Sequence, residues 1–259
     1  MHSVPLSRFG LCISAVVISV YIILNLTVGS VAAQNNTGKI DGPPEVQSVL
    51  KHMRTALGGE EKLGAIKTIF IRTIDVYGPP IGEQPIIHRI SLPDAYQYSL
   101  ENRDVTFTVT GKEFWRKPGW EMADTPRSLI IRRFTNMCLL LLGQSSGLVA
   151  MSASIDKEAP AGITRLILTG DVKRSLELDS EWRPRVLEHP IDIYDFSGSV
   201  RHTTMRSVVE KWNQKSGLWS PALISEAALP DAPKTIRFDE ILVNERVSNS
   251  DFTAPVTKK

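Results

Sequence analysis

Apolar residues follow three different patterns along the chain, and each pattern predicts a different kind of segment. Residues 11–28 form an almost continuous apolar run. Within residues 46–57, apolar side chains recur every three or four positions, which is the spacing of one helix face. From residue 68 onward, short stretches alternate apolar and polar residues, as half-buried β-strands do. The chain therefore predicts a leading apolar segment, one amphipathic helix and a mainly β domain.

The amphipathic helix is predicted around residues 45–57. Its apolar stripe consists of Val46, Val49, Leu50, Met53 and Leu57. Pro43-Pro44 precedes the stripe and Gly58-Gly59 ends it. A further short turn of helix is expected at residues 62–65. A helix with a single apolar stripe needs a larger partner, so we expect it to lie against a sheet.

The strand pattern is clearest in residues 105–110, where Val105, Phe107 and Val109 alternate with three threonines. Most of the segments between predicted strands are short, which favours an antiparallel meander. The predicted strands are residues 68–77, 85–92, 95–100, 105–110, 113–116, 163–169, 172–178, 185–189, 191–196, 200–212, 222–227 and 235–243.

One predicted helix, near residues 125–144, interrupts the strand series. Thr125-Pro126 forms an N-cap followed by proline at the first helical position. Its shared apolar face comprises Ile130, Phe134, Met137 and Leu141. Residues 137–142, which include Cys138, are apolar on every side. Such a helix is either buried in the core or covers an apolar cavity.

The leading segment has the order of a secretory signal. Arg8 precedes the apolar run, and small residues end at Ala33, where cleavage is expected. The alternative is an uncleaved anchor, because the run is nearly long enough to span a bilayer. We therefore predict a signal peptide or anchor over residues 1–33, a flexible leader over 34–42 and a single domain over 43–259. After cleavage, Cys138 is the only cysteine, so no internal disulfide can form.

Composition narrows the classes of function. Hydrophobic residues make up 42% of the chain, charged residues 22%, and the net charge is +2, which suits a globular protein and disfavours a nucleic-acid partner. No HExxH, GxSxG, P-loop or GxGxxG motif is present, and the histidines are widely spaced. We therefore expect no catalytic residues, no bound metal and no cofactor.

Several motifs, taken in order, resemble the periplasmic lipoprotein carrier proteins of the Lol system. Residues 109–118 resemble the V-x-DGK-x-LW-x-x-x-P hairpin of that family, and residues 91–96 occupy the place of its turn between strands. Residues 125–130 look like the start of its lid helix. Residues 241–244 and 251–255 are similar to its last strand and F-x-x-P finish.

The resemblance implies a mainly β fold with α-helices: an incompletely closed antiparallel half-barrel covered by helices. It also implies a secreted, periplasmic protein that binds a lipid or acyl chain and is not an enzyme. We expect a monomer. The residues expected to form the apolar cavity and lid are Tyr96, Tyr98, Phe107, Val109, Phe114, Trp115, Ile130, Phe134, Met137 and Leu141. The alternative is an envelope structural or regulatory protein of the same fold, with a filled interior, that binds a protein partner through a sheet edge.

Overall fold

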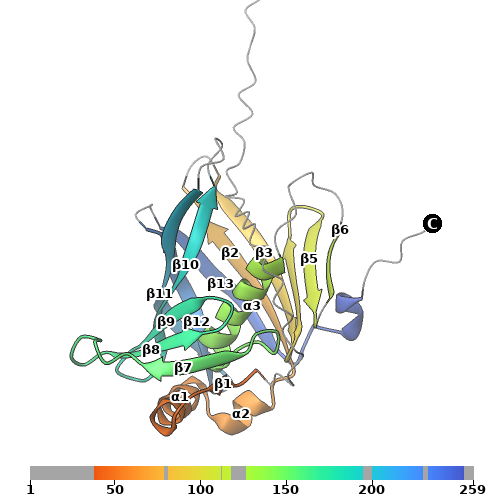
Figure 1. Ribbon diagram of the computed structural model, residues 1–259. Coiled ribbons are helices and arrows are strands. Elements are labelled where there is room, and N and C mark those ends of the chain that lie inside the picture. The colour runs from red at the N-terminus through yellow and green to blue at the C-terminus, as the bar shows by residue number, and fades with distance from the viewer. Residues whose placement is uncertain are drawn as a thin grey trace, which may run out of the picture.

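One curled sheet of thirteen strands carries the fold (Figure 1). The computed structural model describes residues 38–78, 81–111, 113–117, 127–194, 200–229 and 233–253. The leading apolar segment, the expected cleavage site after Ala33 and the N-cap at Thr125 lie outside the described residues.

Most strands are neighbours in both sequence and space. The strands are β1 (Ile40–Asp41), β2 (Thr68–Val76), β3 (Glu83–Ser91), β4 (Ala95–Leu100), β5 (Val105–Thr110), β6 (Glu113–Lys117), β7 (Met151–Ile155), β8 (Thr164–Thr169), β9 (Lys173–Leu178), β10 (Pro184–Tyr194), β11 (Val200–Lys215), β12 (Leu218–Ala228) and β13 (Lys234–Val243). Their order in the sheet is β1-β7-β8-β9-β10-β11-β12-β13-β2-β3-β4-β5-β6. Every pair is antiparallel except β1–β7, so the predicted meander is confirmed.

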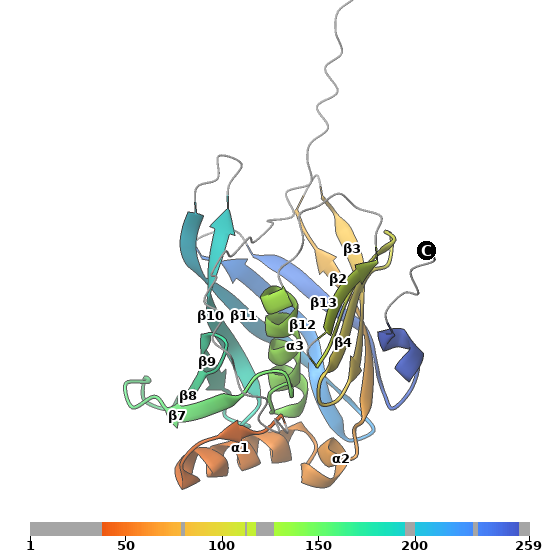
Figure 2. The same cartoon turned by 45° about the vertical axis from the view of Figure 1, so that its right-hand side comes forward.

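The sheet is open, because its edge strands β1 and β6 do not pair with each other in the described part of the chain. The predicted half-barrel is therefore confirmed. Two meanders, β2–β6 and β7–β13, join side by side through the pairing of β13 with β2. The chain must consequently cross the hollow of the sheet between β6 at one edge and β7 near the other. Helix α3 (Arg127–Leu142) lies in this crossing (Figure 2).

The predicted amphipathic helix is α1 (Pro44–Leu57), and its five predicted apolar residues are all buried. The backbone N–H groups of Gly58 and Gly59 donate to the carbonyls of Thr55 and Arg54, and both glycines have positive φ, which ends the helix. A short helix α2 (Glu60–Gly64) follows, and a 3-10 helix, η1 (Asn249–Phe252), comes near the C-terminus. None of the described helices combines the length and apolar character needed to cross a bilayer.

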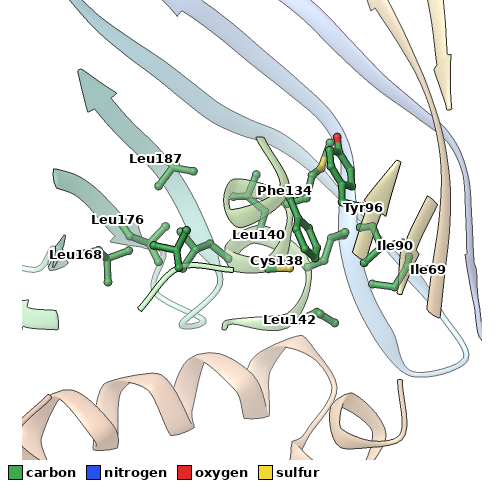
Figure 3. Close-up of a cluster of buried hydrophobic side chains, with 14 of the residues drawn as sticks. Ile69, Ile90, Tyr96, Phe134, Cys138, Leu140, Leu142, Leu168, Leu176 and Leu187 are labelled. Carbon is green, nitrogen blue, oxygen red and sulfur yellow. The ribbon is translucent and has the colours of Figure 1, made fainter. Parts of the chain in front are cut away.

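Helix α3 is enclosed by the sheet. Ser128 is its only exposed residue, whereas ten residues from Ile130 to Leu142 are buried. Figure 3 shows α3 between Leu168, Leu176 and Leu187 on one side and Ile69, Ile90 and Tyr96 on the other. The rings of Phe134 and Tyr96 stack with centroids 5.1 Å apart. Of the two alternatives left by the sequence, this burial supports a core helix.

Two strand predictions need correction. The short strands β1 and β7 were not predicted, and the two strands predicted on either side of Pro190 form one strand, β10. Pro190 pairs with Thr204 of β11, while the ladder of β10 with β9 ends at Glu188 and Ser175. A proline lacks an N–H donor, but at this point of β10 no second ladder requires one.

Candidate ligand-binding site

An apolar pocket of about 560 Å³ lies at the C-terminal end of α3. Leu141 and Leu142 of α3 form one wall, and strands β12 and β13 form another. The apolar lining residues are Ile66, Ile69, Leu141, Leu142, Leu218, Trp219, Pro221, Ala222, Phe238, Ile241, Leu242 and Val243. The polar lining residues include the exposed Asn213, Lys215, Ser216 and Glu245. The pocket therefore combines an apolar wall with polar groups that reach water.

A β-bulge in β13 builds this wall. Phe238 pairs with Thr73 of β2, but Glu240 pairs with Arg72, so Asp239 is an extra residue in the ladder. The extra residue brings the odd-numbered Ile241 onto the same face as the even-numbered Phe238. Without the bulge, the side chains of Ile241 and Val243 would lie on the face opposite to that of Phe238.

A smaller cavity of about 50 Å³ lies deeper, between the middle of α3 and the sheet. Phe238 lines both cavities. The apolar residues of the smaller cavity are Met137, Leu140, Leu187, Ile224, Ile236 and Phe238, and its polar residues are Thr73, Asp75, His88, Arg133, Asn136, Ser207 and Glu226. The smaller cavity is thus apolar on one part of its wall and charged on another.

The charged residues of this wall, Asp75, Arg133 and Glu226, form a cluster with Lys234, which lies next to the cavity lining. We call these two carboxylates and two cations the ion cluster. The Lys234 Nζ atom lies 2.7 Å from Asp75 Oδ2 and 3.0 Å from Glu226 Oε2. The Arg133 guanidinium, which comes from α3, lies 3.7 Å from Asp75 Oδ2. The cluster therefore joins α3 to β2, β12 and β13, and its formal charges cancel.

Burial and charge shift the pKa values of groups around the ion cluster. Burial raises the pKa of Glu226, but Lys234 and Arg133 outweigh this effect and hold it at about 2. Burial and the nearby Arg133 hold the pKa of His88 well below its usual value, so the ring is neutral. His88 bonds to Tyr96 (2.8 Å) and Thr73 (3.2 Å) through its two ring nitrogens.

A second polar group contacts α3 at Arg132 and Asn136. Arg174 of β9 is fully buried, forms two hydrogen bonds with Asp171 and donates to Asn136 of α3. Arg132 of α3 lies 3.8 Å from Asp171. Burial, followed by the charges of Arg174 and Arg132, lowers the pKa of the nearby His189 to about 4. The arginines of α3 thus bind both halves of the sheet.

The structure brings most of the predicted strand residues together on the inner face. In the β4–β5 ladder, Tyr96 pairs with Val109 and Tyr98 pairs with Phe107. Phe114 pairs with Val109 and packs on the core. Trp115 is the neighbour of Phe114 in β6 and pairs with Thr108, so it lies on the other face of the sheet.

The predicted helix residues Ile130, Phe134, Met137 and Leu141 are all buried, but they serve different regions. Phe134 packs on Tyr96, whereas Met137 lines the smaller cavity and Leu141 lines the apolar pocket. Leu141 is therefore the only residue of the predicted set that lines the larger of these two cavities.

Sequence reasoning missed the pocket wall and the ion cluster. The pair Asp239-Glu240, which interrupts the apolar residues of β13, is the one sequence signal of the bulge. The cluster residues are far apart in the chain, and only the sheet order brings them together. The described residues hold no group of three or more His, Cys, Asp or Glu side chains arranged to bind a metal ion.

Among known proteins, the chain is similar only in structure, to several solved structures. No family model matches the chain, and no curated protein is similar to it in sequence. A LolA superfamily protein from Nitrosomonas europaea is similar at 14% identity and a TM-score of 0.49, covering 80% of this chain and 97% of that one. An outer membrane lipoprotein-sorting protein domain from Vibrio parahaemolyticus is similar at 11% identity and a TM-score of 0.42, covering 72% and 88%.

A DUF1329 family protein from Desulfovibrio piger is also similar, at 8% identity and a TM-score of 0.39, covering 80% of this chain and 97% of that one. Two of these three structures carry the names of the lipoprotein carrier group that the sequence motifs resemble. The chain is similar to these three structures at 14% identity or less and at TM-scores below 0.5.

Proposed function

We propose that this protein binds the apolar chain of a lipid in the pocket between α3, β12 and β13. The observation that carries the proposal is the pocket itself. Its volume of about 560 Å³ falls within the usual range for small-molecule sites, which are mostly apolar with a few polar groups. An acyl chain would cover apolar side chains that otherwise face water, at roughly 25 cal/mol per Å² of buried apolar surface.

The proposed ligand site differs from the expected one. The inner face of β4 and β5 was expected to line the cavity, but Tyr96 and Val109 are fully buried there and Phe134 fills the space beside them. We therefore assign the apolar ligand to the C-terminal end of α3.

The protein acts by binding and not by catalysis in this proposal. The most reactive arrangement of side chains described is the chain Thr73–His88–Tyr96, and all three residues are at most 1% exposed. None of the three lines the apolar pocket that we assign to the ligand. The signal-like segment over residues 1–33 supports a location in the cell envelope, and we propose the periplasm.

A second candidate is a protein partner bound through a sheet edge. The filled space between α3 and β4–β5 favours it, since that part of the interior has no room for a lipid. Within the described residues, β6 has β5 as its only strand neighbour, so its outer edge could pair with an added strand. Lipids that copurify with the protein would separate the two candidates, because the partner-binding alternative requires none.

Trp219 gives a direct test of the lipid site, because it lines the pocket. A fatty acid brominated along its chain should quench the fluorescence of Trp219 when it binds. The Trp219→Phe variant should lose most of the quenching. Trp115→Phe is the matched control, because Trp115 lies on the other face of the sheet, and it should retain the quenching. Quenching that is absent, or equal in both variants, would argue against this pocket.

A further inference from the structure

A buried carboxylate oxygen in the ion cluster lacks a hydrogen-bond donor. Asp75 is 1% exposed, and its recorded contacts with Lys234, Arg133 and Tyr77 all use Oδ2. No donor in the described part of the chain is bonded to Oδ1. Leaving a buried acceptor unpaired is unfavourable, more so for a charged group. Oδ1 is therefore available to accept a hydrogen bond from a group outside the described residues.

The smaller cavity, which Asp75 lines, adjoins the apolar pocket. Its volume of about 50 Å³ exceeds the space that one water needs. Phe238 belongs to the linings of both cavities, so the two cavities adjoin at this residue. A rotation of this partly exposed side chain would join the pocket to the smaller cavity. An elongated molecule in the pocket would then end beside Asp75.

We propose that the inner end of the ligand carries a neutral hydrogen-bond donor, a hydroxyl group, that binds Asp75 Oδ1. The ligand class is thus a long-chain alcohol or another apolar molecule with a terminal hydroxyl. This inference rests on the proposed lipid-binding function and adds the chemistry of the polar end.

Charge balance selects a hydroxyl over an acid. Lys234 and Arg133 are already matched by Asp75 and Glu226, so the ion cluster has no spare positive charge for an anionic group. A carboxylate would bring acceptors only, and it would place a third negative charge beside two carboxylates. A hydroxyl donates one proton to Oδ1 and adds no charge. It can also accept a hydrogen bond from a neighbouring donor.

Three ligands of one chain length test the proposal with the wild-type protein: decanol, decyl methyl ether and decanoate. Titration calorimetry should show decanol binding about tenfold more tightly than the ether, which lacks the donor, and more tightly than decanoate. Equal affinity for all three would overturn the hydroxyl inference and leave the apolar pocket supported. Binding of none of them would instead overturn the proposed function.

Two variants test whether the preference for decanol over the ether depends on Asp75 and the smaller cavity. Asp75→Ala should bind decanol and the ether equally. If that variant does not fold, Phe238→Trp offers a second test, because the larger ring should block the inner cavity and remove the preference for decanol. Asp156→Ala is the matched control, since Asp156 pairs with Arg165 on β8 and touches neither cavity, and it should keep the tenfold preference. A preference that survives in both Asp75→Ala and Phe238→Trp would refute the assignment to Oδ1.

Discussion

The enclosure of α3 predicts a severe effect for a charge at Leu141. This residue is 5% exposed and lies on the last turn of the helix. Leu141→Asp would lose roughly 2 kcal/mol of apolar burial, and placing an unpaired carboxylate there costs several kcal/mol more. The sum approaches the total free energy of unfolding of a typical domain, about 5–15 kcal/mol. We therefore expect the variant to be largely unfolded at neutral pH.

Denaturant unfolding, followed by circular dichroism, measures the effect. Ser128→Asp is the matched control, because Ser128 is the one exposed residue of the same helix, and a negative charge in the first turn should change stability by less than about 1 kcal/mol. Burial raises the pKa of an introduced aspartate, so the penalty at position 141 should shrink as the pH falls toward about 4. A folded Leu141→Asp variant with the stability of the wild type would refute the view of α3 as a core helix.

Three further predictions concern buried groups. Lys234→Met leaves Asp75 and Glu226 without their shared cation and should lower the free energy of unfolding by about 3–5 kcal/mol, measured by urea denaturation, with partial recovery when Glu226→Gln is added. His189 has a pKa of about 4 when folded against 6.5 when unfolded, so the unfolded state binds more protons between these values. Stability should fall by roughly 3 kcal/mol from pH 6.5 to pH 4 through this group, and His189→Gln should flatten the measured curve. Cys138 is buried, which raises the pKa of its thiol, so a water-soluble thiol reagent should label it only after denaturation. One labelled thiol per denatured chain is expected if cleavage after Ala33 removes Cys12, whereas two indicate that Cys12 remains.

The repeating parts of the fold could be predicted from local patterns. The stripe from Val46 to Leu57 gave α1, and the alternation of Val105, Phe107 and Val109 gave β5. The buried free thiol of Cys138 also followed from the apolar surroundings in the sequence, and its burial is confirmed. These features depend on neighbouring residues only, so the sequence holds enough information to place them.

The features that need distant residues could not be predicted. The ion cluster joins Asp75 of β2 to Lys234 of β13, which are neighbours only because the two meanders meet at β2 and β13. Arg133 is close in sequence to the apolar face of α3, but nothing in the sequence indicates that a buried carboxylate lies opposite it. The bulge at Asp239 similarly reverses the face of the residues that follow, which strict alternation cannot anticipate.

The position of a bound ligand is the most direct test of the account. A crystal of the protein with a long-chain alcohol brominated in its chain would locate the bromine by its anomalous scattering. We expect a bromine site among Leu141, Leu218 and Ile241, at the C-terminal end of α3. Bromine on the inner face of β4 and β5, or only on the outer surface of the sheet, would contradict it.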